Sequence, residues 1–239
     1  MVRVARVPPP GTRYREAMVT IAPSILAADF GRLADEVDAV GEDVEWVHVD
    51  LMDGHFVPNL SIGPPVVASL RRHTHKLLDC HLMVTDPGRW LEPLAEAGAD
   101  GCSVHVELGD PTPLLGRIRA LGMMAGVVID GPTAFEVVEP YLDERIDLLL
   151  VMTITAGFGG QSFQPEQLPK IERAATIRRE RGLGFHIEVD GGVKVDTAPL
   201  VARAGADVLV SGTGIYDGRD PRAAAAALRA AADSALDRR

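Results

Sequence analysis

Short apolar runs rich in Val, Ile and Leu recur at roughly 25- to 30-residue intervals along the 239-residue chain, which is typical of alternating strands and helices. An apolar run with little internal alternation indicates a strand that is covered on both faces, as in a parallel sheet. The sequence therefore predicts repeated βα units around a buried parallel sheet. The eight runs begin near Ile21, Trp46, Lys76, Gly101, Met124, Asp147, Gly184 and Asp207.

Amphipathic patterns that indicate helices lie between these runs. An Ala-rich segment follows the last run and is expected to form an outer helix over the final strand. The predicted helices span residues 30–40, 87–97, 165–181, 196–204 and 221–236.

Eight units in one series, with no linker-like segment between them, predict an α/β fold: a single (β/α)₈ TIM barrel over residues 19–239. An open doubly wound sheet is the alternative. Its usual Gly-x-Gly-x-x-Gly turn is not found, because the first run leads instead into Ala27, Ala28 and Asp29. Residues 1–18, which contain three consecutive prolines, are predicted to be a flexible N-terminal extension.

Composition limits the partners of the chain. A net charge of -10 at pH 7 argues against broad binding to nucleic acid or to an anionic membrane surface. No apolar stretch approaches the roughly 20 residues that a membrane-spanning helix needs. Cys80 and Cys102 are the two cysteines of the sequence, and no secretory signal is recognisable, so we expect buried thiols and a cytoplasmic protein.

Ionisable side chains recur on one face of three predicted strands. In the second strand, period-2 alternation places His48, Asp50 and Met52 on one face and the valines on the other. His81 occupies the same kind of position in the third strand, and Asp190 ends the seventh. These positions lie in the carboxyl halves of the strands, where barrel enzymes place their active sites.

Two histidines and two aspartates on inward faces could form the ligand set of one divalent ion, such as zinc, manganese, iron or cobalt. For any single residue, an interior hydrogen bond or an ion pair explains the position better than a metal does. For the four together the metal site is favoured, because several buried charges would otherwise lack compensation at a cost of several kcal/mol.

Several motifs resemble the ribulose-phosphate 3-epimerase family, from about residue 20 to residue 217 and in the family's order. The most specific are Ile-Ala-Pro-Ser-Ile-Leu-Ala-Ala-Asp-Phe at 21–30 and His-Val-Asp-Leu-Met-Asp-Gly-His-Phe-Val-Pro-Asn at 48–59. The other motifs lie at residues 81–84, 103–107, 157–161 and 189–192.

The resemblance implies an isomerase of the pentose phosphate pathway that epimerises C3 of a ketose phosphate, most simply D-ribulose 5-phosphate to D-xylulose 5-phosphate. It implies that His48, Asp50, His81 and Asp190 bind the metal and that Asp50 and Asp190 transfer protons through an enediolate. His105 and Glu107 alternate inward on the fourth strand and are interpreted as supporting residues. A homo-oligomer is also expected.

The substrate site implied by the resemblance includes an apolar lining and a set of glycine-bearing turns. The methionines could equally be core residues, since a thioether fills irregular space well. The glycines after the sixth, seventh and eighth strands would let backbone N–H groups reach a phosphate. The predicted substrate-binding residues are Ser24, His81, Met52, Met83, Met152, Gly157, Phe158, Gly159, Gly160, Gly191, Gly192, Gly212 and Thr213.

The sequence departs from the family pattern in two places near this site. Thr155-Ala156 stands where an Asn-Pro pair is expected, and Asp130-Gly131 replaces an Asn-Pro pair after the fifth strand. These changes leave open a different ketose phosphate, such as D-allulose 6-phosphate. A non-catalytic phosphosugar-binding paralogue is a further alternative, although the acid/base and metal set is intact.

Barrel decarboxylases and hexulose-phosphate synthases form a rival class of enzyme, which requires a lysine where this chain has Met52. A Schiff-base aldolase would need a lysine pointing inward from a strand. Neither requirement is met, because the lysines of the sequence are expected at a strand start, in a helix and after a turn: Lys76, Lys170 and Lys194.

Overall fold

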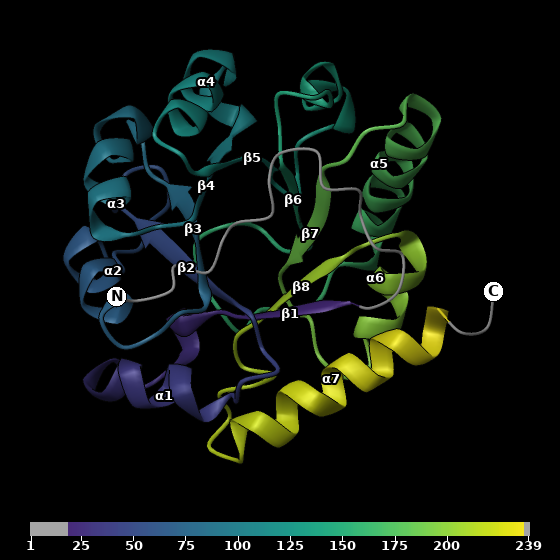
Figure 1. The fold of residues 1–239 in the computed structure, drawn as a ribbon. Coiled ribbons are helices and arrows are strands. Elements are labelled where there is room, and N and C mark those ends of the chain that lie inside the picture. The colour runs from purple at the N-terminus through teal and green to yellow at the C-terminus, as the bar shows by residue number, and fades with distance from the viewer. Residues whose placement is uncertain (1–18, 237–239) are drawn as a thin grey trace.

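The computed structural model describes residues 19–236 as a barrel of parallel strands surrounded by helices (Figure 1). From β2 to β8, each strand pairs in parallel with the next strand along the chain, and β1 pairs with β8. A bridge between Ser24 and His48 joins β1 to β2 and closes the ring. The strands are β1 (Thr20–Pro23), β2 (Trp46–Met52), β3 (Leu77–Met83), β4 (Gly101–His105), β5 (Met124–Ile129), β6 (Leu148–Met152), β7 (His186–Asp190) and β8 (Val208–Ser211).

The predicted TIM barrel and all eight predicted strands are confirmed, with each strand beginning within two residues of its expected position. The predicted extension at residues 1–18 lies outside the described residues. Between residues 19 and 236, no helix combines the length and the apolar character that crossing a membrane would require.

Helices follow most strands and cover the outside of the ring (Figure 1). The predicted helices at 30–40, 87–97 and 165–181 each begin with a short 3₁₀ turn before the α-helix proper. The α-helices are α1 (Leu33–Ala39), α2 (Pro64–Arg71), α3 (Leu91–Ala97), α4 (Thr112–Ala120), α5 (Leu168–Arg181), α6 (Ala198–Ala204) and α7 (Pro221–Leu236).

The connection from β5 to β6 differs from a regular βα unit. It contains two 3₁₀ turns, Phe135–Val137 and Glu139–Tyr141, in place of an α-helix. Pro140 lies inside the second turn, and a proline in a helix interior removes a backbone hydrogen bond and clashes with the preceding turn. The eight-stranded barrel is as predicted, and this connection is the one in the described chain that lacks an α-helix.

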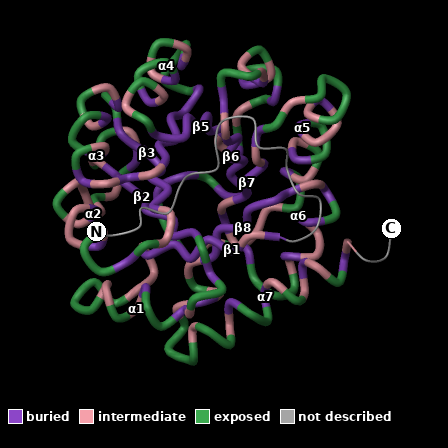
Figure 2. The backbone as a smooth tube through the Cα atoms, viewed as in Figure 1, coloured by how far each residue is buried: buried purple, intermediate pink, exposed green. Residues whose placement is uncertain are grey.

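Strand alternation divides the core into an outer layer and an interior. Val47, Val49 and Leu51 of β2 pack outward in the large core between strands and helices, as predicted from their positions. The purple tube of buried residues in Figure 2 follows the strands, whereas the outer helices alternate between buried and exposed residues.

The barrel interior is apolar near the amino ends of the strands. Trp46, Met124, Leu148 and Val208, which lie at the starts of four strands, form a buried cluster with Ala22 and Val210. This cluster, here called the apolar floor, occupies the barrel interior near the amino ends of the strands. The ionisable side chains of the interior therefore lie above an apolar floor, towards the carboxyl ends of the strands.

Three aspartates, here called braces, link neighbouring strands and helices at the amino-terminal end of the barrel. Each precedes an even-numbered strand, accepts an N–H from the preceding strand and faces an arginine of an earlier helix. The braces are Asp100 with Arg71 and the N–H of Leu78, Asp147 with Arg119 and the N–H of Ala125, and Asp207 with Arg178 and the N–H of Ile187.

We expect Asp207→Ala to lower the free energy of unfolding by about 3–5 kcal/mol, because the Asp207 carboxylate is 3% exposed and its loss breaks a buried ion pair. Urea denaturation would measure the change. Glu92→Ala is the control: it breaks an ion pair with Arg117 on the surface, where both side chains are nearly half exposed, and should cost far less. Equal losses in the two variants would contradict the assignment of Asp207 as a buried brace.

Candidate active site and metal centre

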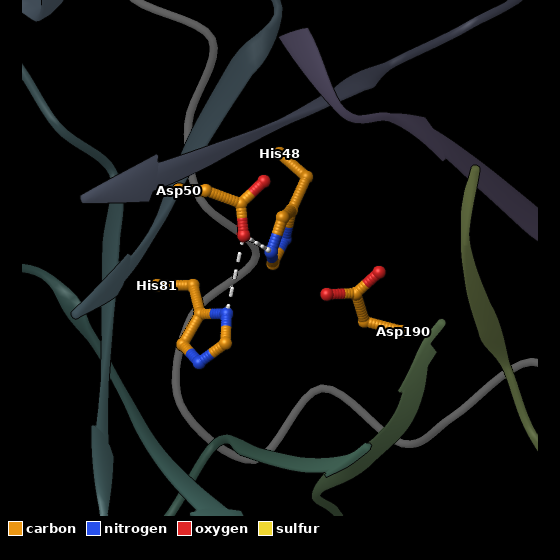
Figure 3. A group of neighbouring side chains, drawn as sticks. All are labelled: His48, Asp50, His81 and Asp190. Atoms are coloured by element: carbon orange, nitrogen blue, oxygen red, sulfur yellow. Dashed lines mark ion pairs between the residues drawn. The ribbon is translucent and has the colours of Figure 1, made fainter. Parts of the chain in front are cut away.

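Four ionisable side chains converge at the carboxyl ends of the strands (Figure 3). His48 and Asp50 extend from β2, His81 from β3 and Asp190 from the last position of β7. One nitrogen or oxygen atom from each lies within 4.8 Å of the others. Figure 3 shows Asp190 facing the other three side chains from across the site. The structure thus brings together all four residues that the sequence selects.

The ring nitrogens of the two histidines are well suited to hold a cation. His48 Nε2 and His81 Nδ1 lie 3.5 Å and 3.4 Å from Asp50 Oδ1. Within the described chain, both nitrogens are buried without a hydrogen-bond partner. Such an atom is costly unless a proton or a metal satisfies it. Two imidazoles and two carboxylates are also a donor set that zinc and related divalent ions accept, so these residues fit a metal site.

Two further carboxyl groups, of Asp79 and Glu188, lie on the side of His48 away from Asp50. His48 Nδ1 is 3.0 Å from Asp79 Oδ2 and 3.4 Å from Glu188 Oε1. Both carboxyl groups are buried, and neither oxygen of Glu188 has a hydrogen-bond partner among residues 19–236. Sequence reasoning missed Asp79 and Glu188. The signal was available, because each lies two residues before a selected residue and so shares its inward face.

The surroundings push the pKa values of the two candidate catalytic carboxyl groups apart. Burial alone would raise the pKa of Asp50, but the charge of His48 and the proximity of His81 outweigh it and hold that pKa far below its usual range. Burial, and then the negative charge of Asp50, raise the pKa of Asp190 to about 7. Asp50 is therefore an ionised acceptor near neutral pH, whereas Asp190 can carry a proton.

A cavity opens above this group. Ser24 lies on its wall and donates a hydrogen bond from Oγ to Asp50 Oδ2 at 2.7 Å. His81, also predicted to bind substrate, does not line the cavity, and its side chain is fully buried. The predicted substrate-binding residues that do line it are Ser24, Met52, Met83, Met152, Gly157, Phe158, Gly159, Gly160, Gly191, Gly192, Gly212 and Thr213.

The three predicted methionines form one apolar wall. Met52, Met83 and Met152 belong to a buried cluster in the upper interior of the barrel, separate from the apolar floor. They come from β2, β3 and β6 and surround the space between Asp50 and Asp190. The methionines therefore present apolar surface to the cavity beside the two carboxylates.

Glycine is required where the loop after β7 passes behind the cavity. Gly192 has a φ of +66°, and a Cβ there would lie 2.5 Å from the backbone nitrogen of Phe163. Within the described chain, neither Lys nor Arg lines the cavity. An anion bound in these loops would therefore meet backbone N–H groups and the Thr213 hydroxyl rather than a side-chain cation.

The loops after β2 and β6 contact each other at the mouth of the barrel. Asn59 Nδ2, after β2, donates a hydrogen bond to the carbonyl oxygen of Gly157, after β6, at 2.9 Å. Asp53 holds the first loop, because its carboxylate accepts the backbone N–H groups of His55, Phe56 and Thr85. Phe158 at the tip of the second loop is 50% exposed at the cavity.

Comparison with known proteins places the chain among its relatives. The model of the ribulose-phosphate 3-epimerase family matches residues 20–216. The chain belongs to this family. The ribulose-phosphate 3-epimerase of Mycobacterium tuberculosis is 49% identical over 218 residues, which cover 90% of this chain and 93% of the relative. The cytoplasmic isoform from Oryza sativa is 44% identical, with 89% and 94% covered, and the Bacillus subtilis enzyme is 44% identical, with 89% and 99% covered.

Solved structures resemble this ribulose-phosphate 3-epimerase family member in fold. KGPDC from Streptococcus mutans aligns with a TM-score of 0.66 at 19% identity, covering 92% of this chain and 98% of the other. The 3-hexulose-6-phosphate synthase from Salmonella typhimurium aligns with a TM-score of 0.66 at 20% identity, covering 90% and 99%. At such identities the likeness shows the barrel alone.

Two of the three lysines of this family member, Lys76 and Lys170, are engaged away from the cavity, and Lys194 follows β7 rather than lying in a strand. Lys76 Nζ donates to the carbonyl oxygens of Gly41 and Val44, and Lys170 Nζ donates to those of Asp130 and Gly131. Each is held at the edge of the barrel by two carbonyl groups. The positions agree with the sequence prediction that no lysine points into the site from a strand.

Proposed function

We propose that this protein is a metal-dependent epimerase acting at C3 of a ketose phosphate, most simply converting D-ribulose 5-phosphate into D-xylulose 5-phosphate. The observation that carries the proposal is the pairing of Asp50 and Asp190, which face one site from β2 and β7 with pKa values shifted in opposite directions. The names of the relatives support the same reaction.

Epimerisation beside a ketone removes a proton from one face of a carbon and returns one to the other, so two groups are needed. In one direction the Asp50 carboxylate accepts the C3 proton, which leaves an enediolate. Asp190, protonated beforehand, then donates its proton to the opposite face. The reverse reaction exchanges the two roles and restores the starting protonation.

The ligand set proposed for the ion is His48, Asp50, His81 and Asp190. A bound divalent ion would supply positive charge beside the oxygen atoms on which negative charge develops. Ser24 fixes one oxygen of Asp50 by its hydrogen bond and so orients the carboxylate towards the site. Met52, Met83 and Met152 keep water from the enediolate without competing strongly as ligands.

The phosphate is proposed to bind at the glycine-bearing turns after β6, β7 and β8. These turns lie together along one side of the cavity, and the loops after strands seven and eight commonly bind phosphate in this fold. Gly191, Gly192 and Gly212 bring the backbone close to the cavity, and Thr213 adds a hydroxyl group. The expected homo-oligomer, cytoplasmic location and absence of nucleic-acid partners stay predictions.

Incubation with ribulose 5-phosphate in deuterated water tests the reaction. We expect xylulose 5-phosphate to form and deuterium to enter C3, followed by NMR. The same assay with D-allulose 6-phosphate tests the alternative substrate, which is suggested by the departures from the family pattern at Asp130 and Thr155. Binding of either sugar phosphate without exchange would instead support a non-catalytic phosphosugar-binding protein.

Asp50→Asn and Asp190→Asn should each lower kcat by about 10²- to 10⁴-fold, because each removes a proton-transfer group. Circular dichroism should show that both variants stay folded. Asp143→Asn, which alters an ion pair with Arg145 away from the cavity, is the matched control and should retain its rate. Near-normal turnover in either site variant would refute the two-carboxylate mechanism.

Removal of the ion by a chelator should abolish turnover and also lower the Tm. An ion at about one hundred times its Kd stabilises the folded state by roughly 2.7 kcal/mol through binding alone. Refilling with zinc, manganese, iron or cobalt, one at a time, would show which ion restores each property. An unchanged Tm and rate after verified metal removal would contradict metal dependence.

A further inference from the structure

His81 shares a hydrogen bond with a second buried histidine. Its Nε2 lies 2.8 Å from Nε2 of His105, and the planes of the two rings are 22° apart with centroids 5.0 Å apart. Two ring nitrogens at this distance must share one proton, so one donates and the other accepts. The direction of this bond decides which nitrogen of His81 keeps a lone pair.

Glu107 sets the direction. His105 Nδ1 lies 2.9 Å from Glu107 Oε2, and an ionised carboxylate can only accept. Burial alone would raise the pKa of Glu107, but hydrogen bonds from His105 and from the backbone of Asp130 outweigh it and lower the pKa to about 2. Glu107 is therefore ionised near neutral pH, and His105 carries its proton on Nδ1.

A neutral His105 with its proton on Nδ1 offers a lone pair at Nε2. His81 must then carry its own proton on Nε2 and donate it to His105. The lone pair of His81 is left on Nδ1, which is the buried atom that lacks a hydrogen-bond partner in the described chain and lies 3.4 Å from Asp50 Oδ1.

We propose that His105 and Glu107 are positioning residues for His81, which hold its proton on Nε2 and so keep Nδ1 free for the ion. This inference rests on the metal site of the proposed function. A carboxylate or another acceptor behind a ligand histidine commonly fixes the tautomer and orientation of the ring.

The chain of hydrogen bonds is fixed at Glu107 and packed against an aromatic ring at His105. Glu107 Oε1 accepts the backbone N–H of Asp130 at 2.9 Å, which fixes the carboxylate between two loops. The ring of Phe56 lies 4.7 Å from that of His105 and covers its other side. His105 is 1% exposed, so water cannot readily replace either partner.

His48 shows the same arrangement in a shorter form. Its Nδ1 faces Asp79 Oδ2 at 3.0 Å, and its Nε2, turned towards Asp50, has no hydrogen-bond partner within residues 19–236. In both histidines the nitrogen away from the site is linked to a carboxylate. The link is direct for His48, through Asp79, and passes through His105 to Glu107 for His81. The nitrogen on the site side is the one that has no hydrogen-bond partner in the described chain.

The tautomer can be measured on the full-length, ion-free protein labelled with ¹⁵N-histidine, with His81→Gln used to assign the signals. We expect His81 of the wild type to be protonated on Nε2. His105→Phe retains a ring of similar shape but no acceptor, so a large fraction of His81 should move its proton to Nδ1. His105→Gln places an amide oxygen near the lost acceptor and should restore the original tautomer.

Zinc and manganese binding, measured without substrate by competition with a chromophoric chelator, gives an independent readout. His105→Phe should weaken both ions by about 10- to 100-fold. His105→Gln should recover most of the loss. Ser103→Ala is the matched control, since it changes a buried inward side chain two residues earlier on β4 and outside the hydrogen-bond chain, and it should bind as the wild type does.

A proton on Nδ1 of His81 in the wild type would overturn the proposal. So would wild-type affinity for both ions in a folded His105→Phe variant, or an equal loss in His105→Gln or Ser103→Ala, since that loss would reflect packing rather than the acceptor. None of these measurements involves turnover. They therefore separate a failure of this inference from a failure of the proposed epimerase activity.

Discussion

The interior of the barrel depends on compensating buried negative charge. Asp50, Asp79, Glu188 and Asp190 surround His48, and an isolated buried carboxylate costs several kcal/mol. The four cannot all be anions beside one imidazole, which agrees with pKa values raised to about 8 for Glu188 and about 7 for Asp190. Only protons or a cation can balance the group. A fold that maintains such a cluster is therefore prepared either to bind a positive ion or to hold protons for transfer.

Strand geometry determines where this cluster can form. Consecutive side chains alternate between the helices and the interior, so residues two apart in β2 carry the site while their neighbours anchor the strand in the outer core. The amino ends of the strands supply an apolar floor around Trp46 and Leu148. The ionisable side chains are thereby confined to the end of the barrel at which the strands finish. Asp50 and Asp190 line the cavity there, whereas Glu188, two residues earlier on β7 than Asp190, does not.

The same alternation explains what could be predicted from the sequence. The eight strands and the convergence of His48, Asp50, His81 and Asp190 followed from periodicity and from the common edge of parallel strands. Asp79 and Glu188 were missed because a buried carboxylate on an inward face is recognised as part of a site only when its partners are known. The segment after β5, for which no particular helix was predicted, forms two 3₁₀ turns, and Pro140 lies within the second. Hydrogen-bond direction between histidines requires coordinates, because it depends on which nitrogen faces which.

The two departures from the family pattern near the cavity prove to be one local feature. The backbone N–H of Ala156 donates to Asp130 Oδ1 at 3.0 Å, so the loop after β6 is tied to the loop after β5. A proline at position 156 has no N–H and could not make this bond. Ala156 and the Asp130 carboxylate are thus matched to each other. The bond lies at the base of the loop that carries Gly157 and Phe158, so the two substitutions shape a loop that lines the cavity and leave the ligand cluster unchanged.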